Sequence, residues 1–129
     1  MGDENAANDR VIQQGEIYWV QLDTLDGLDA GIPHPHLVIQ DNVLNHSRIP
    51  TVVVCGLTTN QNRANLPGSI VLEAGEANLP KRSIIEVSKV SSISKARLGE
   101  YIGTLSEQRV QQVLAAMRFL QRSFFSRFS

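Results

Sequence analysis

The sequence predicts a mostly β domain, a small antiparallel barrel or sheet of about five short strands with one helix at the C-terminal end. Three observations lead to this fold class. Short runs of β-branched and aromatic residues are separated by Gly, Pro, Asn and Asp. Strands and helices do not alternate regularly, which argues against a parallel sheet. Near the C-terminal end, apolar residues recur at helical spacing.

The first half of the chain contains three expected strands. The first is Gly15–Asp23, GEIYWVQLD, which is rich in aromatic and β-branched residues. The segment from Asp23 to Pro35 contains glycines and prolines that break both helix and central strand, so it is expected to form an exposed loop of about a dozen residues. His36–Gln40 and Thr51–Leu57 are the next strands, joined by the polar residues 41–50.

A second polar loop, Thr58–Gly68, follows the third strand. Two further strands are expected at Ser69–Leu72 and Ser83–Val87, because both segments are apolar and β-branched. Ile93–Leu98 is a short segment beyond them, followed by Glu100–Gly103. The second half of the sheet is therefore expected to come from Ser69–Leu72 and Ser83–Val87.

The C-terminal helix is expected to start at Ser106 as N-cap, or at Thr104 paired with Glu107. Its core face is the apolar stripe Val110, Val113, Leu114 and Met117. The last twelve residues contain all four phenylalanines with three arginines between them. We expect this segment to pack on the domain or on a second subunit.

Length and composition indicate one domain. A chain of 129 residues with 42% hydrophobic residues can bury a modest core without disulfide or metal staples. The polar, acidic residues 1–13 are expected to be a disordered tail and 14–129 the folded domain. The sequence contains no apolar run long enough for a transmembrane helix, so none is expected. It also does not start with a basic stretch followed by an apolar one, so no signal peptide is expected. A single cysteine, Cys55, in an apolar run indicates a buried reduced thiol and a cytoplasmic protein.

The net charge of −1 is unevenly distributed. Residues 1–40 contain seven acidic residues and one arginine, a charge of −6, whereas residues 41–129 contain six acidic and eleven basic residues, a charge of +5. The later segment could bind a polyanion, but no dense Lys/Arg run is present. Charge therefore permits nucleic-acid binding without establishing it.

The usual motifs for phosphate loops, Cys-x-x-Cys or His-Glu-x-x-His metal sites and Gly-x-Ser-x-Gly hydrolases are absent, so no cofactor and no metal are expected. Polar groups gather in two loops. The first contains Asp29, His34 and His36, and the His-x-His pair is a weak metal signal. The second contains the polar residues Thr58, Thr59, Asn60, Gln61 and Arg63. These groups are the candidates for chemistry, although none is specific when read alone.

An ordered series of segments over about residues 14–117 resembles the MazF/PemK family of toxins, which share a CcdB-like fold. The matching segments, in order, are Gly15–Asp23, Pro35–Asn42, Thr51–Gln61, Asn65–Pro67, Ser83–Leu98 and Gly99–Glu107. The resemblance implies a homodimeric endoribonuclease that cuts single-stranded RNA at short sequences without a metal and is neutralised by a cognate antitoxin chain.

The cleavage chemistry of such toxins requires removal of a proton from a ribose 2′-hydroxyl, stabilisation of charge on the phosphate and protonation of the leaving oxygen. The resemblance places Thr58 at the family's threonine position, but His34 stands where the family has arginine, and Leu28 stands where some members have histidine. His34 could act as a general acid or base, with His36 or His46 assisting. Alternatively, the loss of a permanent cation could leave a fold that binds and does not cut.

The candidate catalytic residues are therefore His34 and Thr58. The candidate RNA-binding residues are Thr59, Asn60, Gln61, Arg63, Lys81, Arg82 and His36. The leading hypothesis is an RNA-cutting toxin. The alternative is a non-catalytic binding protein on the same fold, either a gyrase inhibitor like CcdB or a degenerate toxin that retains partner binding. A DNA-binding regulatory module is disfavoured because no helix-turn-helix pattern is present.

Overall fold

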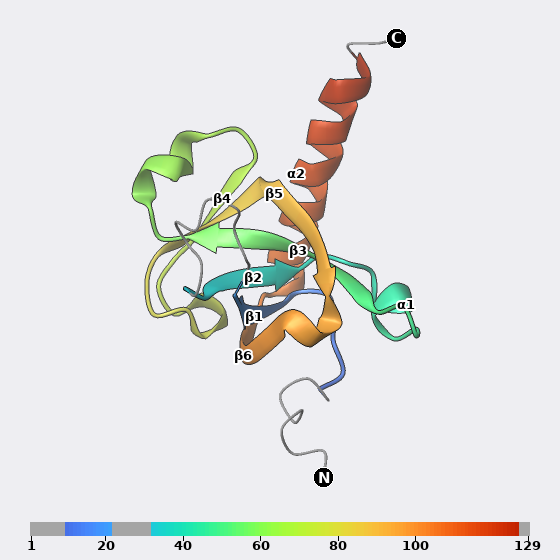
Figure 1. The fold of residues 1–129 in the computed structure, drawn as a ribbon. Coiled ribbons are helices and arrows are strands. Elements are labelled where there is room, and N and C mark those ends of the chain that lie inside the picture. The colour runs from blue at the N-terminus through green and yellow to red at the C-terminus, as the bar shows by residue number, and fades with distance from the viewer. Residues whose placement is uncertain (1–9, 22–31, 127–129) are drawn as a thin grey trace.

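The structure is a computed structural model that describes residues 10–21 and 32–126, with side chains as far as residue 122. Its described part is a six-stranded antiparallel sheet in the order β4-β5-β3-β2-β1-β6, with one long helix (Figure 1). The strands are β1 (Glu16–Val20), β2 (His34–Val38), β3 (Thr51–Thr58), β4 (Ser69–Leu72), β5 (Ser83–Ser94) and β6 (Leu98–Thr104). The sheet is open, because β4 and β6 lie at its two edges. The predicted fold class is confirmed, as a sheet and not a closed barrel.

Five helical elements complete the fold. They are the helices α1 (Asn42–Asn45) and α2 (Glu107–Ser126) and the single turns η2 (Gln61–Asn65), η3 (Glu76–Asn78) and η4 (Lys95–Arg97). α1 lies in the predicted connection 41–50 and starts at Asp41, whose carboxylate accepts from the Val43 N–H at 2.8 Å. The polar connections predicted from the sequence therefore contain short helical turns.

The strand boundaries differ from the sequence prediction, most clearly in β2, β5 and β6. β2 starts two residues earlier, at His34, because it pairs with β1 up to Val20. β5 continues for twelve residues to Ser94, since its second half pairs with β3 after the β4 pairing has ended. β6 is a full strand that pairs with β1 at the sheet edge, so the sheet has six strands.

Apolar residues fill both faces of the sheet. One face packs against α2, and its buried core includes Ile17, Leu37, Ile85 and Val113. The other face holds a second cluster of buried residues, Ile12, Tyr18, Val20, Val38, Val52, Val54 and Leu98. Neighbouring residues of β1, such as Ile17 and Tyr18, belong to different clusters because successive strand side chains point to opposite faces. The sheet therefore has a buried apolar cluster on each face.

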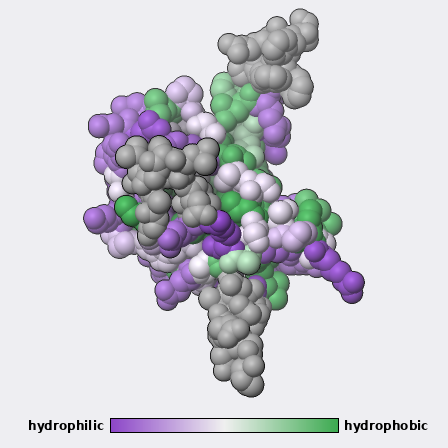
Figure 2. Space-filling view, in the orientation of Figure 1, coloured by the Kyte–Doolittle hydropathy of each residue, from purple (hydrophilic) through white to green (hydrophobic). Residues whose placement is uncertain are grey.

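α2 starts as predicted, since the Ser106 hydroxyl accepts from the Arg109 N–H at 3.2 Å. Within the predicted stripe, Val113 is buried and Val110 and Met117 pack against the core, while Leu114 is half-buried. The C-terminal half of α2 projects beyond the sheet (Figure 1), and Figure 2 shows apolar residues on this projecting part. Phe119, 60% exposed, lies there. The other three phenylalanines lie outside the described side chains.

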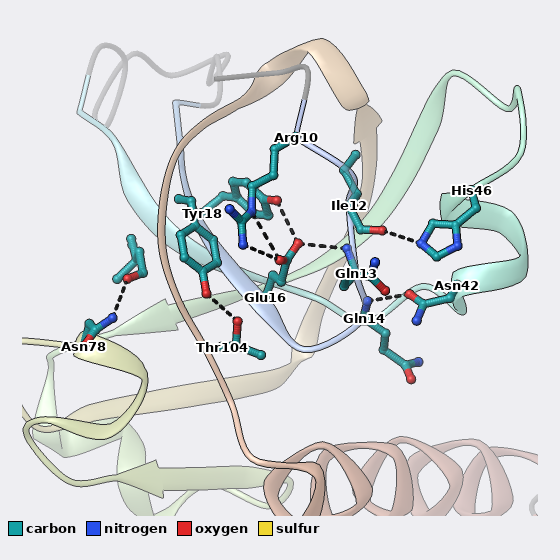
Figure 3. A network of polar contacts seen from close by, with 12 residues as sticks. Arg10, Ile12, Gln13, Gln14, Glu16, Tyr18, Asn42, His46, Asn78 and Thr104 are labelled. Atoms are coloured by element: carbon teal, nitrogen blue, oxygen red, sulfur yellow. Dashed lines mark hydrogen bonds and ion pairs between the residues drawn. The ribbon is translucent and has the colours of Figure 1, made fainter. Parts of the chain in front are cut away.

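Residues 10–13, which the sequence assigned to the tail, pack on the domain (Figure 3). Ile12 is buried, and the Arg10 guanidinium donates to the Glu16 carboxylate at 2.9 Å while lying 3.7 Å from the centre of the Tyr101 ring. The Glu16 carboxylate, almost fully buried, also accepts from the Tyr18 hydroxyl at 2.8 Å. The buried charge attracts Arg10, so the folded part extends at least to residue 10 and the predicted boundary at residue 14 is wrong. Residues 1–9 lie outside the described residues.

Cys55 is a free, fully buried thiol, as predicted. Its Sγ donates to the Glu86 carbonyl oxygen at 2.9 Å. Burial raises the pKa of the Cys55 thiol to about 12, and the nearby Glu86 carboxylate adds to this effect. The thiol therefore stays protonated and unreactive in the folded domain.

Candidate functional site

A pocket of about 310 Å³ opens at the end of the sheet where β1 ends, β2 begins and β3 ends, on the left in Figure 1. Its walls are largely apolar and include Trp19, Pro35, Leu57, Leu79 and Ile102. These residues come from four strands and from the segment after η3. The pocket therefore forms only when the strands pair.

Four of the nine predicted site residues line this pocket: His34, Thr58, Thr59 and Lys81. They come from the start of β2, the end of β3 and the residues just before β5. Among the residues that the structure describes, Lys81 has no ion-pair partner and is exposed. With Ser83, which also lines it, the pocket combines a cation, a histidine and three hydroxyl groups, which together suit a phosphodiester.

The hydroxyl of Thr58 is oriented by its own loop. Its Oγ1 accepts a hydrogen bond from the Asn60 N–H at 3.1 Å, so its O–H hydrogen remains available to donate. The Asn60 side chain in turn accepts from the Asn62 N–H at 3.1 Å and caps η2. Asn60 does not line the pocket. Its part in the loop is to hold the turn that presents Thr58.

Gln61 and Arg82 connect the two polar segments of the site. The Gln61 side-chain amide donates to the Thr59 carbonyl at 2.9 Å and to the Arg82 carbonyl at 3.1 Å. The Arg82 guanidinium donates back to the Gln61 side-chain oxygen, and it also lies 3.6 Å from the Glu73 carboxylate. Neither residue lines the pocket, yet they hold Thr59 and Lys81 on its rim.

Arg63 lies outside the pocket and pairs with Glu86 of β5 at 3.0 Å. The Glu86 side chain is 8% exposed, and Lys89 also lies 3.7 Å from it. A buried carboxylate needs a partner cation, so the charge of Arg63 serves Glu86 in this structure. Arg63 therefore shares the η2 turn with Gln61 but does not line the pocket.

His36 is buried beneath the site and does not line the pocket. Its Nδ1 lies 2.9 Å from the His34 carbonyl oxygen and must donate, because a carbonyl only accepts. It stands opposite Gly56 of β3, where a Cβ would lie 3.8 Å from the His36 Nε2, an ordinary contact. Burial lowers the pKa of His36, against the opposing effect of its hydrogen bond to His34.

His46 is separate from the site. Its Nε2 donates to the Ile12 carbonyl at 3.1 Å, next to the N-terminal segment (Figure 3). Asp29 lies outside the described residues. Among the residues that are described, no three His, Cys, Asp or Glu side chains are grouped so that they could hold a metal ion. Within the same residues, no helix is both long and apolar enough to cross a membrane.

Sequence reasoning missed the apolar half of the site. Trp19 was read only as part of the first strand, although its neighbours Tyr18 and Val20 are buried and it is 37% exposed. The exposure was not visible in the sequence because it depends on β1 ending beside the start of β2 and β6. The sequence feature that could have indicated a role for Trp19 is its position near the end of an apolar strand and just before a long loop.

Comparison with known proteins agrees with this architecture. Residues 13–120 match the family described as PemK-like, MazF-like toxin of type II toxin-antitoxin system. The chain is 32% identical over 108 residues to endoribonuclease MazF6 of Mycobacterium tuberculosis H37Rv, covering 84% of this chain and 95% of that protein.

Two solved structures are similar in fold. One is an endoribonuclease in complex with its cognate antitoxin from Mycobacterial species, with a TM-score of 0.66 and 20% identity over 82% of this chain and 90% of that chain. The other is MazE-MazF (Form-II) from Deinococcus radiodurans, with a TM-score of 0.72 and 18% identity over 88% and 97%. Both likenesses concern the fold. The match over residues 13–120, together with the curated relative, shows that this chain belongs to the PemK-like, MazF-like family of toxins of type II toxin-antitoxin systems.

Proposed function

We propose that this chain is the toxin of a type II toxin-antitoxin pair and that it cuts single-stranded RNA in the pocket at the end of the sheet, without a metal ion. Family membership supports this function, because the curated relative of similar length is named an endoribonuclease. The observation that carries it is the meeting of His34, Thr58 and Lys81 in one pocket from three separate segments.

These three side chains suit the cleavage reaction. The 2′-hydroxyl of the ribose attacks the adjacent phosphorus, the bond to the 5′-oxygen of the next nucleotide breaks, and a cyclic phosphate remains. Thr58 donates its O–H to a phosphate oxygen, and Lys81 neutralises the charge that develops there. His34 takes the proton from the 2′-hydroxyl and gives a proton to the leaving 5′-oxygen, which arginine at this position does not readily do. Thr59 on the rim supplies a second hydroxyl for the RNA backbone.

The remaining predicted RNA contacts divide into two groups. Asn60, Gln61 and Arg82 act through the loops that they hold in place, by the hydrogen bonds given above. Arg63 and His36 act on the stability of the site, since both are engaged with partners beneath or beside it. Loss of any of these side chains is therefore expected to lower activity through the position of Thr58, Thr59 or Lys81.

The expected partners are an antitoxin chain and a second copy of this chain, and the expected location is the cytoplasm. The solved complex of a similar endoribonuclease with its cognate antitoxin supports the first of these. Co-expression with the neighbouring open reading frame, followed by purification through one tagged chain, would recover a stable complex if the pair exists.

The function is tested by incubating the purified full chain with a long single-stranded RNA in EDTA, and mapping the cut sites and end groups. Discrete cuts with cyclic-phosphate ends are expected. Thr58→Ala and His34→Ala should each lower the cleavage rate by about 100-fold or more. His46→Ala is the matched control, since His46 does not line the pocket. All variants should unfold at the wild-type temperature.

His34→Arg distinguishes two hypotheses for His34: that it transfers a proton in the reaction, or that it marks the loss of the family's permanent cation. If His34 transfers a proton, arginine at this position lowers the rate and changes the pH profile. If His34→Arg cuts RNA and the wild type does not, the wild-type chain is a binding protein that has lost the family's cation. In that case a pull-down with the gyrase subunit decides between a gyrase inhibitor and a degenerate toxin.

A further inference from the structure

Trp19 is the one residue of β1 that is open to solvent. It is 37% exposed, whereas Glu16, Ile17, Tyr18 and Val20 are all 3% exposed or less. Trp19 is among the residues that line the pocket with His34 and Thr58. A large exposed aromatic in a concave site is a typical anchor for a ligand.

The backbone of Trp19 lies between two neighbouring strands, β2 and β6. On one side it pairs across the sheet with Pro35 of β2, whose ring also lines the pocket. On the other side, Gly99 of β6 approaches so closely that a Cβ there would lie 2.8 Å from the Trp19 carbonyl oxygen and 3.7 Å from its Cβ. The backbone of Trp19 is therefore held at the pocket wall by the strands on both sides.

The size and lining of the pocket suit a flat, partly apolar group. Its volume of about 310 Å³ is at the lower end of the range of about 300–1,000 Å³ for ligand sites. Leu79, Pro80 and Ile102 complete the apolar wall, while Thr59 and Ser83 offer hydroxyl groups. The Ser83 hydroxyl donates to the Lys81 carbonyl at 2.9 Å, which leaves its oxygen free to accept.

We propose that this pocket holds one unstacked nucleobase of the RNA and that Trp19 stacks on its face, beside the phosphate bound by Thr58 and Lys81. This inference rests on the proposed function, because it takes RNA to be the ligand. Single-stranded RNA is recognised by stacking of splayed bases on aromatic side chains, and the hydroxyls at the pocket wall meet the edge of the base. Trp19 is thus a specificity residue for the nucleotide next to the cut.

The test uses the fact that Trp19 is the only tryptophan of the chain. Its fluorescence is recorded while the full chain is titrated with a short, fully 2′-O-methylated RNA, which binds but has no 2′-hydroxyl for the attack. Saturable quenching is expected. A set of the same oligonucleotides, each lacking one base at a different position, should identify one position whose loss abolishes the quenching although every phosphate is retained.

Binding of the variants completes the test. Trp19→Leu keeps an apolar side chain without an aromatic face and should weaken binding by about 5- to 100-fold, whereas Trp19→Phe should retain most of the affinity. Phe119→Ala is the matched control, because Phe119 is an exposed aromatic residue outside the pocket. Thermal unfolding confirms that each variant is folded.

Two results would overturn the inference. The first is that Trp19→Leu binds the 2′-O-methylated RNA with wild-type affinity. The second is that quenching of Trp19 fluorescence survives the removal of each base in turn, which would mean that the pocket takes a different ligand, such as an apolar side chain of the antitoxin. The binding readout does not depend on cleavage. A base-specific signal in a chain that never cuts RNA would contradict only the proposed catalysis, and cleavage with unchanged Trp19→Leu binding would contradict only this inference.

Discussion

Gly103→Ala tests the close backbone contact between β6 and η3. Gly103 of β6 lies directly against the backbone of η3, and a Cβ at this position would be 2.5 Å from the carbonyl carbon of Ala77 and 3.1 Å from its Cα. The carbonyl oxygen would be closer still. Ordinary contact begins at 3.4 Å, so the two backbones would have to separate by about 0.9 Å at the carbonyl carbon.

The atoms that would clash with the new Cβ belong to the backbone of Ala77, so no flexible side chain can move aside. Ala77 and Asn78 already have positive φ angles of 49° and 62°, which for residues other than glycine leave little room to adjust. The Asn78 side chain also donates to the Ile102 carbonyl at 3.1 Å, which ties η3 to the strand that carries Gly103. Overpacking of this kind costs about 3 kcal/mol, which lowers the midpoint of thermal unfolding by roughly 10 °C.

The assay is urea unfolding of wild type and variant at the same protein concentration, because an oligomer would make the midpoint depend on concentration. Gly56→Ala is the matched control. A Cβ at Gly56 of β3 would lie 3.8 Å from the His36 imidazole, an ordinary contact, so a change within about 0.5 kcal/mol is expected. The reasoning is refuted if Gly103→Ala is as stable as the wild type, or if Gly56→Ala loses as much.

Three further predictions concern titrating groups. Cys55, with its pKa raised to about 12 by burial, should not react with a thiol reagent at pH 8 until urea unfolds the chain; rapid reaction of the native protein would contradict its burial. The Arg109 guanidinium lowers the pKa of Glu76 below 4.5, so the stability that this pair contributes should be present above that pH and be lost as the pH falls. Arg109→Gln should therefore reduce the difference in unfolding free energy between pH 6 and pH 3, and an unchanged difference would count against the pair. Burial lowers the pKa of His36 below 6.5, so unfolding free energy should decrease as the pH falls from 6.5, and His36→Gln should show a smaller decrease in urea titrations.

The local features of the sequence predicted the strand positions well where a strand is apolar throughout. β4 has the predicted ends, Ser69 and Leu72, and β3 differs only by including Thr58. Both strands are short and are bounded by polar or turn residues that are visible in the chain. The Ser106 cap of α2 was also predictable, because a cap acts over three residues of sequence.

Pairing between distant segments was less predictable. β6 contains two glycines and a glutamate, which weaken any strand signal, and it is a strand because β1 provides hydrogen-bond partners along it. The second half of β5 has exposed or half-buried side chains, so its sequence lacks an apolar run, and its pairing with β3 decides its conformation.

The candidate site divides in the same way. Of the polar residues that line it, His34, Thr58, Thr59 and Lys81 were named from the sequence, whereas Ser83 was not. The partners of Arg63 and Arg82 were not, because an ion pair such as that between Arg63 and Glu86 joins residues 23 positions apart. From sequence alone, an arginine or lysine in a polar loop is a candidate for phosphate binding, and only the structure shows whether it forms an ion pair with a carboxylate instead.

The sequence by itself determined the fold class, the core face of α2, the buried thiol and the residue types available for chemistry, since each of these follows from local composition and periodicity. The tertiary structure alone decided that the sheet stays open, that residues 10–13 belong to the domain, and that Trp19 faces a pocket beside Thr58. These properties depend on which strands become neighbours. Neighbours are selected by the packing of the whole chain, and no single segment encodes that choice.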